Sequence, residues 1–233
     1  MEILGKKDLF FDLDHTLWDF DKNAEETLSE LFNLYKFENL GILSADTFIE
    51  SYEVNNKKLW ALYHNGHITK EDLRISRFKN TFEDLGIDGN LFPAAFEEDY
   101  IRLCPHKTNL FPHTHEILEY LQSKYDLHVI SNGFKEASLI KLEKSKLQPY
   151  FKTTIISEVV GIHKPNPLIF EYAVNNAETQ IDASVMIGDS LEADIQGAVN
   201  VGMDAIFFNP NKQEKPPIVK YSIESLKELA QIF

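Results

Sequence analysis

Features typical of secreted, membrane-spanning and nucleic-acid-binding proteins are scarce in this sequence. A single cysteine, Cys104, among 233 residues excludes an intramolecular disulfide. No apolar run is long enough to cross a membrane, and the first residues lack the apolar segment of a signal peptide, so we expect no membrane partner and a cytoplasmic location. Basic residues are outnumbered, with 23 against 37 acids and a formal net charge of −14. This balance argues against a nucleic-acid polymer as a partner.

The sequence does contain enough apolar material for a folded core. Hydrophobic residues make up 43% of the chain and aromatic residues 12%, which argues against a disordered protein. The length suits one large domain, or a core with a smaller insertion. A small phosphorylated metabolite is compatible with the negative charge, because a metal ion, one lysine and backbone N–H groups can hold a phosphate locally.

The periodicity of apolar residues changes twice along the chain. Residues 8–12 predict a short buried strand, whereas every periodic segment from about 17 to 104 is helical. Three helix starts are predicted in that stretch, by Asp46 as a cap, by Thr69 and Asp72 as a capping box, and by Pro93 in the first turn of a helix over 90–102.

After residue 104, predicted strands alternate with predicted helices. The strands are expected over 127–131, 153–157, 184–188 and 205–208, and the helices over 115–124, 135–146, 167–176, 193–201 and from Ser222 onward. Strands separated by helices form parallel sheets. The sequence therefore predicts an α/β fold, a doubly wound, mainly parallel open sheet built from residues 1–16 and 105–233, with an inserted α-helical domain over 17–104.

Polar residues follow four of the predicted strands at the point where each strand ends. They are Asp12, Asp14 and Thr16 after the first strand, Ser131 and Asn132 after the second, Lys164 after the third, and Asp189 and Asp194 after the fourth. Open parallel sheets bind ligands at the carboxyl ends of their strands, where the strand order reverses. We therefore expect these residues to meet at one edge of the sheet.

The chemistry of this set indicates a bound cation and a phosphate. Carboxylates that crowd together raise one another's pKa values, and a hard divalent cation such as Mg²⁺ removes that conflict. Lys164 adds a positive charge aimed at a phosphoryl group. The groups that could bind the phosphoryl oxygens are the hydroxyls of Thr16 and Ser131 and the backbone N–H groups of Leu13 and Asn132.

The spacing of Asp12 and Asp14 suggests a different role for each. Side chains two residues apart point the same way if the chain stays extended, so both carboxyls would face one bound phosphate. Asp12, nearer the strand, is placed to attack phosphorus as a nucleophile. Asp14 is placed to protonate the leaving oxygen and later to take a proton from water.

These features resemble a known family. The segments "FFDLDHT", "VISN", "HKPNP" and "IGDSLEAD" match in order the four motifs of the haloacid dehalogenase superfamily, and the resemblance covers the whole chain, with a helical cap at 17–104. It implies these roles: Asp12 as nucleophile, Asp14 as acid/base and as a metal ligand through its backbone carbonyl, Ser131 and Lys164 on the phosphoryl group, Asp12 and Asp189 on Mg²⁺, and Asp194 in support of the metal or the lysine.

The helical insertion resembles one particular group within this superfamily. Residues 55–69, "NNKKLWALYHNGHIT", followed by "SRF", are similar to the cap of bacterial pyrimidine 5′-nucleotidases. This similarity implies an Mg²⁺-dependent phosphomonoesterase that hydrolyses pyrimidine nucleoside monophosphates through an aspartyl-phosphate. One departure from the family is His15, where glycine is usual, which puts the geometry of that loop in question. The candidate specificity residues are His15, Trp18, Phe20 and Trp60.

Several alternatives stay open on the sequence alone. A phosphoglycolate or sugar-phosphate phosphatase would use the same core, and a phosphomutase would keep water away from the aspartyl-phosphate. A 2-haloacid dehalogenase needs neither a metal nor an acid at residue 14, so Asp14 weighs against it. A phosphate-binding module without turnover, similar to a receiver domain, has no leaving alcohol for Asp14 to protonate. The sequence leaves base and sugar preference undetermined, and it is compatible with a monomer or a homodimer.

Overall fold

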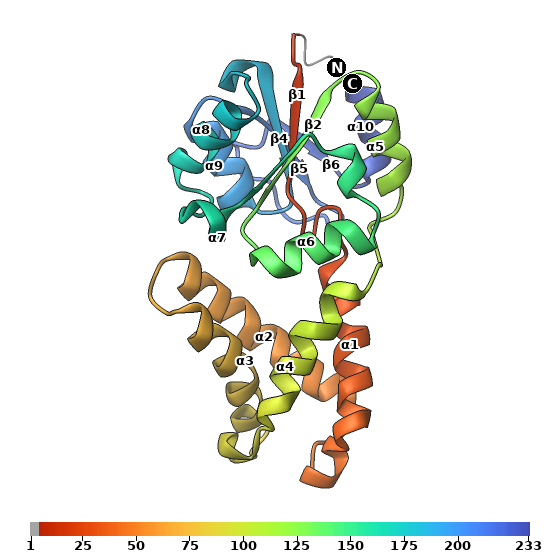
Figure 1. Cartoon of the computed structure of the whole chain (residues 1–233), viewed down its shortest axis with the longest axis vertical. Coiled ribbons are helices and arrows are strands. Elements are labelled where there is room, and N and C mark those ends of the chain that lie inside the picture. The colour runs from red at the N-terminus through yellow and green to blue at the C-terminus, as the bar shows by residue number, and fades with distance from the viewer. Residues whose placement is uncertain (1–4) are drawn as a thin grey trace. The chain divides into compact units, whose positions relative to one another are not determined.

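The computed structural model describes residues 5–233, which form two compact units. The core unit runs up to Phe20 and resumes from Thr108 to Phe233, and the helical unit is Asp21–Lys107. Figure 1 shows a sheet flanked by helices in the core unit and helices alone in the helical unit. Because the division falls after Phe20, both Trp18 and Phe20 belong to the core unit.

A six-stranded parallel sheet in the order β3-β2-β1-β4-β5-β6 forms the centre of the core unit. The strands are β1 Asp8–Phe11, β2 Asp126–Ser131, β3 Thr153–Ile156, β4 Ser184–Gly188, β5 Asp204–Phe208 and β6 Tyr221–Ile223. The strand order reverses at β1, which confirms the predicted doubly wound sheet. The chain leaves β1 at Asp12, so the first of the candidate site residues lies at the reversal, where open sheets bind ligands.

Strand β1 is enclosed on both faces of the sheet. Leu9, Phe10 and Phe11 are all 0% exposed. Phe10 pairs with His128 of β2 on one side and with Met186 of β4 on the other. Successive residues of a strand point to opposite faces, so a strand covered on both faces must be apolar throughout. This is the reason for the continuous apolar segment in the sequence.

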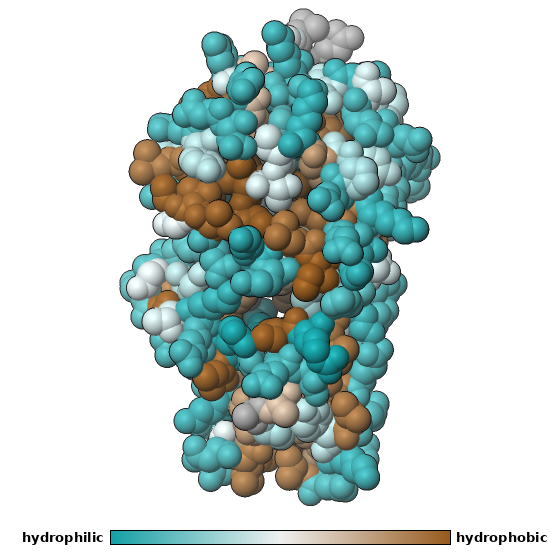
Figure 2. All heavy atoms as spheres, in the orientation of Figure 1, coloured by the Kyte–Doolittle hydropathy of each residue, from teal (hydrophilic) through white to brown (hydrophobic). Residues whose placement is uncertain are grey.

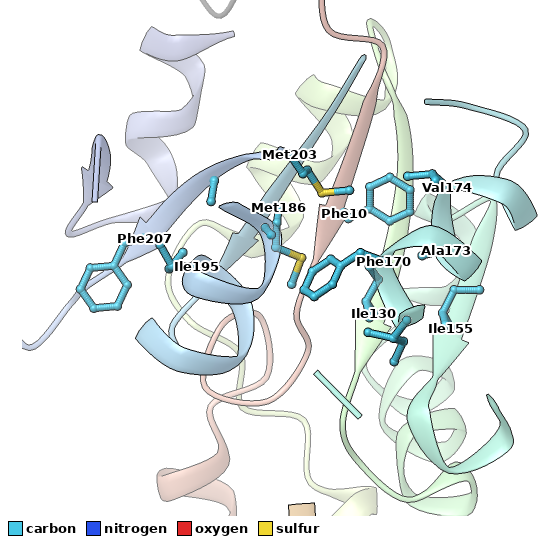
Figure 3. Close-up of a cluster of buried hydrophobic side chains, with 13 residues drawn as sticks. Phe10, Ile130, Ile155, Phe170, Ala173, Val174, Met186, Ile195, Met203 and Phe207 are labelled. Carbon is cyan, nitrogen blue, oxygen red and sulfur yellow. The ribbon is translucent and has the colours of Figure 1, made fainter. Parts of the chain in front are cut away.

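Helices cover both faces of this sheet. They are α5 Thr114–Gln122, α6 Lys135–Lys144, α7 Ser157–Val160, α8 Pro167–Asn176, α9 Gly197–Asn200 and α10 Leu229–Ile232, and a π-helical segment, Leu191–Gln196, precedes α9. Figure 3 shows Phe10 and Met186 from the strands packed beside Phe170 of α8 in one apolar layer. In Figure 1, α5 and α10 lie together on the other side of the sheet from α8 and α9.

The helical unit has a hydrophobic core of its own. Its helices are α1 Phe20–Tyr35, α2 Ala45–His64, α3 Lys70–Asp84 and α4 Ala94–Leu103. The buried ring of Phe37 lies at the centre of an aromatic cluster, with centroids 5.4 Å from Phe48, 5.0 Å from Phe82 and 4.9 Å from Phe96. Because each such pair contributes about 0.5–1.5 kcal/mol beyond simple burial, this cluster stabilises the unit from within.

The start of α3 confirms one prediction, and the start of α2 corrects another. The side chains and backbone N–H groups of Thr69 and Asp72 form the expected capping box. Asp46 is not the cap of α2, because it lies in the first turn. The cap is Ser44, whose hydroxyl oxygen accepts a hydrogen bond from the N–H of Thr47 at 3.2 Å. Serine at this position satisfies an N–H group that would otherwise lack a partner within the helix.

The helix predicted over 90–102 begins later than expected. Residues Gly89–Leu91 form a separate short turn, and α4 begins only at Ala94. The side chain of Asp88 accepts a hydrogen bond from the N–H of Asn90 at 2.9 Å, which caps that short turn. Pro93 has an extended backbone and immediately precedes α4, so it lies outside the helix and not in its first turn.

The helix predicted from Ser222 is wrong in its first residues, because this segment forms β6. The N–H of Asn209 donates to the carbonyl of Ile223 at 2.7 Å, and Ile223 is buried beside β5. Helical turns follow only after Ser225, which forms a capping box with Glu228. Pairing with β5 buries an apolar side chain, and an isolated short helix offers less burial.

The visible face of the core unit is mostly polar, as the net charge suggests (Figure 2). Apolar side chains gather on that face over α7 and α8, where Val159 and Leu168 are exposed. Inner residues of α8, such as Ile169 and Phe170, are buried in the core instead. Within residues 5–233, no helix has the length and apolar character needed to cross a membrane.

Candidate active site

The chain turns sharply after β1, and this turn presents Asp12 and Asp14. The N–H of Asp12 donates to the carbonyl of Ile187 in β4 at 2.9 Å, which holds the end of the strand in the sheet. His15 has a left-handed backbone with φ of 62°, and its N–H donates to the carbonyl of Trp18 at 2.9 Å. Glycine adopts this conformation freely, whereas other residues lose roughly 1–2 kcal/mol. The backbone of His15 is therefore strained at this position, whereas a glycine would not be.

Three carboxylates converge where β1 and β4 end. Oxygens of Asp12, Asp189 and Asp194 all lie within 4.8 Å of one another. Asp189 accepts a hydrogen bond from the hydroxyl of Thr16 at 3.2 Å. Asp194 accepts a hydrogen bond from the N–H of Ser190 at 3.0 Å. The helix predicted over 193–201 begins earlier than expected, with the segment Leu191–Gln196, and Ser190 immediately precedes it. The hydrogen bond between Thr16 and Asp189 joins residues 173 positions apart, so the fold brings together the ends of β1 and β4, which lie far apart in the sequence.

Lys164 lies buried among these acids, with 2% of its surface exposed. Its ammonium donates to Asp12 Oδ1 at 2.7 Å, to Asp194 Oδ1 at 2.6 Å and to the carbonyl of Ile130 at 2.7 Å. Asn132 holds the backbone of Lys164 from both sides, since its amide accepts from the Lys164 N–H and donates to the Lys164 carbonyl, both at 2.9 Å. The Asn132 side chain therefore fixes the lysine, in addition to any part its backbone plays in binding phosphate.

Burial and repulsion alter the pKa values of this group. Burial raises the pKa of Asp12 to about 8 against the opposing charge of Lys164, and Asp194 and Asp189 add to the rise. Burial and the charge of Asp194 raise the pKa of Asp189 to about 6. Burial alone would lower the pKa of Lys164, but the carboxylates of Asp12 and Asp194 outweigh it and raise that pKa. One lysine therefore does not offset the cost of ionising all three acids, and a bound cation would favour their ionised forms.

This donor set fits a hard divalent cation. It consists of carboxylate oxygens only, and hard cations such as Mg²⁺ take oxygen ligands, whereas zinc sites are rich in histidine and cysteine. Within the part of the chain that the structure describes, this is the one cluster of three possible ligands. Asp12 and Asp189 are the natural pair for the cation, because both oxygens of Asp194 accept hydrogen bonds, one from Lys164 and one from the N–H of Ser190, whereas Lys164 binds Oδ1 of Asp12.

The hydroxyl of Ser131 lies at the end of β2 and faces the same edge of the sheet. It accepts a hydrogen bond from the N–H of Gly133 at 3.0 Å, which closes the turn after the strand. A Cβ added at Gly133 would lie 3.2 Å from Ser131 Oγ and 3.5 Å from Asp14 Oδ2. Ser131 and Asp14 are therefore neighbours across this turn, although they are distant in the sequence.

Lys141 is a residue of this site that sequence reasoning missed. Its ammonium donates to Asp14 Oδ1 at 2.6 Å, so the side chain of Asp14 is paired with a lysine and lies outside the carboxylate cluster. A signal was present in the sequence: Ser138, Lys141 and Leu142 recur at helical spacing and are all buried on one face of α6. A lysine on the inner face of a helix is rare unless it is paired, so this position predicts an acidic partner inside the core unit.

The four candidate specificity residues lie in different environments. Trp18 is 0% exposed, and Phe20 contacts it and His15, with ring centroids 6.0 and 4.9 Å away. These three belong to the core unit near the site. Trp60 belongs to α2 of the helical unit, where its ring contacts Tyr63 and His64. In this conformation Trp18 acts as a packing residue.

Comparison with known proteins agrees with this geometry. A family model described as haloacid dehalogenase-like hydrolase matches residues 9–208. The chain is 32% identical over 227 residues to pyrimidine 5′-nucleotidase YjjG of Escherichia coli, with 96% of each chain covered. It is 33% identical to pyrimidine 5′-nucleotidase PynA of Streptococcus pneumoniae, with 94% of this chain and 93% of that protein covered. The crystal structure of the putative HAD-hydrolase YfnB of Bacillus subtilis, bound to magnesium, superposes with a TM-score of 0.84 at 28% identity over 97% of each chain.

The chain belongs to the haloacid dehalogenase-like hydrolase family. Within that family it is an enzyme of the phosphoric monoester hydrolase class, and it resembles the bacterial pyrimidine 5′-nucleotidases. These findings confirm the family that the four motifs indicated.

Proposed function

We propose that this enzyme is an Mg²⁺-dependent 5′-nucleotidase that hydrolyses pyrimidine nucleoside monophosphates through an aspartyl-phosphate. The observation that carries the proposal is the position of Asp12, which directly follows β1, is bound by the ammonium of Lys164 and lies beside the carboxylates of Asp189 and Asp194. The substrate class is supported by two relatives that are named pyrimidine 5′-nucleotidases and cover more than nine-tenths of this chain.

In the first step a carboxylate oxygen of Asp12 attacks phosphorus. A bond forms between that oxygen and phosphorus, the ester P–O bond breaks, and Asp14 gives its proton to the departing nucleoside oxygen. Lys164 favours the ionised form of Asp12 and offers positive charge to the phosphoryl oxygens. When bound, Mg²⁺ would neutralise further phosphate charge and orient the phosphoryl group.

In the second step water attacks the phosphorus of the aspartyl-phosphate. Asp14, now a carboxylate, takes a proton from that water while the bond between phosphorus and the Asp12 oxygen breaks. Inorganic phosphate leaves, and both aspartates return to their starting states. The hydroxyls of Thr16 and Ser131 and the N–H groups of Leu13 and Asn132 are the donors proposed to hold the phosphoryl oxygens in both steps.

The alternative functions fit less well. A 2-haloacid dehalogenase has no use for an acid at residue 14 or for three clustered carboxylates, and this chain has both. A receiver-like module has no leaving alcohol, so it too would leave Asp14 without a role. A phosphomutase would release phosphate in a short burst and then slowly, whereas a phosphatase releases it at a constant rate over many turnovers.

A phosphate-release panel with Mg²⁺ tests the substrate class. UMP, dUMP and dTMP should be hydrolysed faster than purine nucleotides, phosphoglycolate and hexose phosphates. Equal rates for all substrates would contradict the nucleotidase and leave a general phosphatase. Faster hydrolysis of phosphoglycolate or a hexose phosphate would favour the phosphatase alternatives named above.

The Asp12→Asn variant tests the mechanism. It removes the nucleophilic oxygen while keeping the size of the side chain, so phosphate release should fall to the rate without enzyme. Asp126→Asn is a matched control, because Asp126 forms a surface ion pair with Lys152 at 2.6 Å at the start of β2. If Asp12→Asn turned over like the wild-type protein, the proposed covalent intermediate would be wrong.

A further inference from the structure

Lys141 of α6 is a buried cation whose charge faces the proposed acid/base residue. Only 6% of its side chain is exposed, against 22% for Asp14. The distance from its ammonium nitrogen to Asp14 Oδ1 is 2.6 Å, short enough for a charge-assisted hydrogen bond. The two residues are 127 positions apart in the chain, so the contact is a product of the fold.

Two aromatic rings fix the direction of this ammonium. It lies 4.1 Å from the centroid of the Trp18 ring and 5.4 Å from that of Phe20. Cations placed over aromatic faces at these distances are attracted by the negative face of the ring. Because Trp18 is itself fully buried, the rings form a fixed support for the lysine. The ammonium can therefore hold Asp14 in one place.

Among the described residues two lysines are buried, and each binds one of the two aspartates that follow β1. They are Lys164, bound to Asp12, and Lys141, bound to Asp14. Burying a lysine is unfavourable unless its charge is used, and a methionine would fill the same space without that cost. The charge of Lys141 thus has a purpose beyond filling space, and Asp14 is the acid within its reach.

We propose that Lys141 is a positioning residue for the reaction. It binds Oδ1 of Asp14, which leaves Oδ2 on the side of Gly133 and Ser131, the side from which the phosphoryl group is bound in the proposed function. Oδ2 is then the oxygen that gives the proton to the leaving group and later takes one from water. Lys141 acts only through Asp14 and does not touch the substrate. This inference rests on the proposed function.

The test compares two phosphate esters with leaving groups of different basicity. Phenyl phosphate needs a proton on its leaving oxygen, whereas p-nitrophenyl phosphate needs it far less. For Lys141→Met, kcat/KM for phenyl phosphate should fall about 10- to 100-fold, and kcat/KM for p-nitrophenyl phosphate should change little. KM should stay close to the wild-type value for both esters. A loss of equal size for both esters would overturn the proposal.

A double-variant cycle asks whether Lys141 acts through Asp14. On the background of Asp14→Asn, adding Lys141→Met should cause no further loss of activity, because the residue that it positions is already inactive. Multiplied losses in the double variant would overturn the proposal. Lys141→Arg keeps a cation at this position and should recover part of the lost activity with phenyl phosphate.

Controls separate this inference from a folding defect and from the proposed function. Lys144→Met, on the same helix, removes a half-exposed lysine paired with Glu143 and should behave like wild type. Circular dichroism and thermal unfolding check the fold, and Lys141→Gln takes the place of Lys141→Met if that variant does not fold. A wild-type protein inactive on every phosphate ester would refute the proposed function and this inference together. An active wild type with an unaffected Lys141→Met refutes the inference alone.

Discussion

Asp194 lies against the backbone of Gly188, the last residue of β4. A Cβ built on Gly188 would lie 2.2 Å from Asp194 Oδ2, far inside van der Waals contact. The carboxylate cannot easily retreat, because its other oxygen binds Lys164 at 2.6 Å and Oδ2 itself accepts the N–H of Ser190. The absence of a side chain at residue 188 is thus a condition for the pairing of Asp194 with Lys164.

Gly188→Ala adds a single methyl group, but it should disrupt the pairing of Asp194 with Lys164. The added methyl group would force Asp194 away from Lys164, and overpacking of this kind costs about 1–3 kcal/mol of stability. We expect a lower melting temperature and a large loss of phosphate release, measured by thermal unfolding and steady-state kinetics. Unchanged activity would mean that Asp194 has room to move without loss of function.

At the scale of elements, a buried polar network joins the starts of three strands at the end of the sheet away from the site. His128 of β2 contacts Asp8 of β1 at 3.0 Å and Thr153 of β3 at 2.8 Å through its two ring nitrogens. The hydroxyl of Thr179 donates to the second oxygen of Asp8 at 2.5 Å. The network fixes the register of β1, and thereby the height at which Asp12 leaves the sheet.

This network predicts a pH dependence of stability. Burial lowers the pKa of His128 below 6.5, although the nearby carboxylate of Asp8 opposes the shift. Below about pH 6.5 the unfolded chain thus binds more protons at this residue than the folded protein does. As pH falls below about 6.5, protonation of His128 in the unfolded chain should therefore decrease the free energy of unfolding, by at most about 1.4 kcal/mol per pH unit. The decrease should stop once the pH is below the folded-state pKa of His128.

Denaturant unfolding of wild type and His128→Gln between pH 5 and 8 checks this expectation. The variant should be less stable at pH 8, where the network is intact, and the difference between the two proteins should shrink as the solution becomes acidic. Burial also lowers the pKa of His163, but His163 is present in both proteins and cancels in the difference. A difference that grows toward low pH would contradict the expected sign.

At the scale of the whole molecule, the excess of acids makes a bound cation a stabilising ligand. The net charge is −14, and three of the acids, two of them buried, meet in one cluster. A ligand that binds the folded state alone stabilises it by mass action, by about 2.7 kcal/mol at a hundred times its Kd. The cation should therefore support both folding and turnover.

Removal of Mg²⁺ with a chelator should abolish phosphate release and lower the melting temperature, and added Mg²⁺ should restore both. Asp189→Asn should reduce the stabilisation by Mg²⁺, because it takes away one of the two proposed ligands. Sodium chloride at equal ionic strength is the control for simple screening of surface charge. An equal rise in melting temperature with sodium chloride would show that no specific site is involved.

The order of the sequence motifs was sufficient to predict the sheet and most of the site. Apolar periodicity of two or of about 3.6 residues distinguishes strands from helices, and parallel strands bring their carboxyl ends to one edge. Asp12, Lys164, Asp189 and Asp194 could therefore be grouped without coordinates. One exception in the fold is β6, which exists because β5 lies beside it.

By itself, then, the sequence determined which polar residues follow the strands and meet at one edge of the sheet, because local periodicity and parallel topology act through short-range rules. Only the tertiary structure decided what those residues touch. The pairing of Lys141 with Asp14 spans 127 residues, and the ammonium over Trp18 depends on how α6 packs. Such contacts follow from packing in three dimensions, which no local pattern encodes.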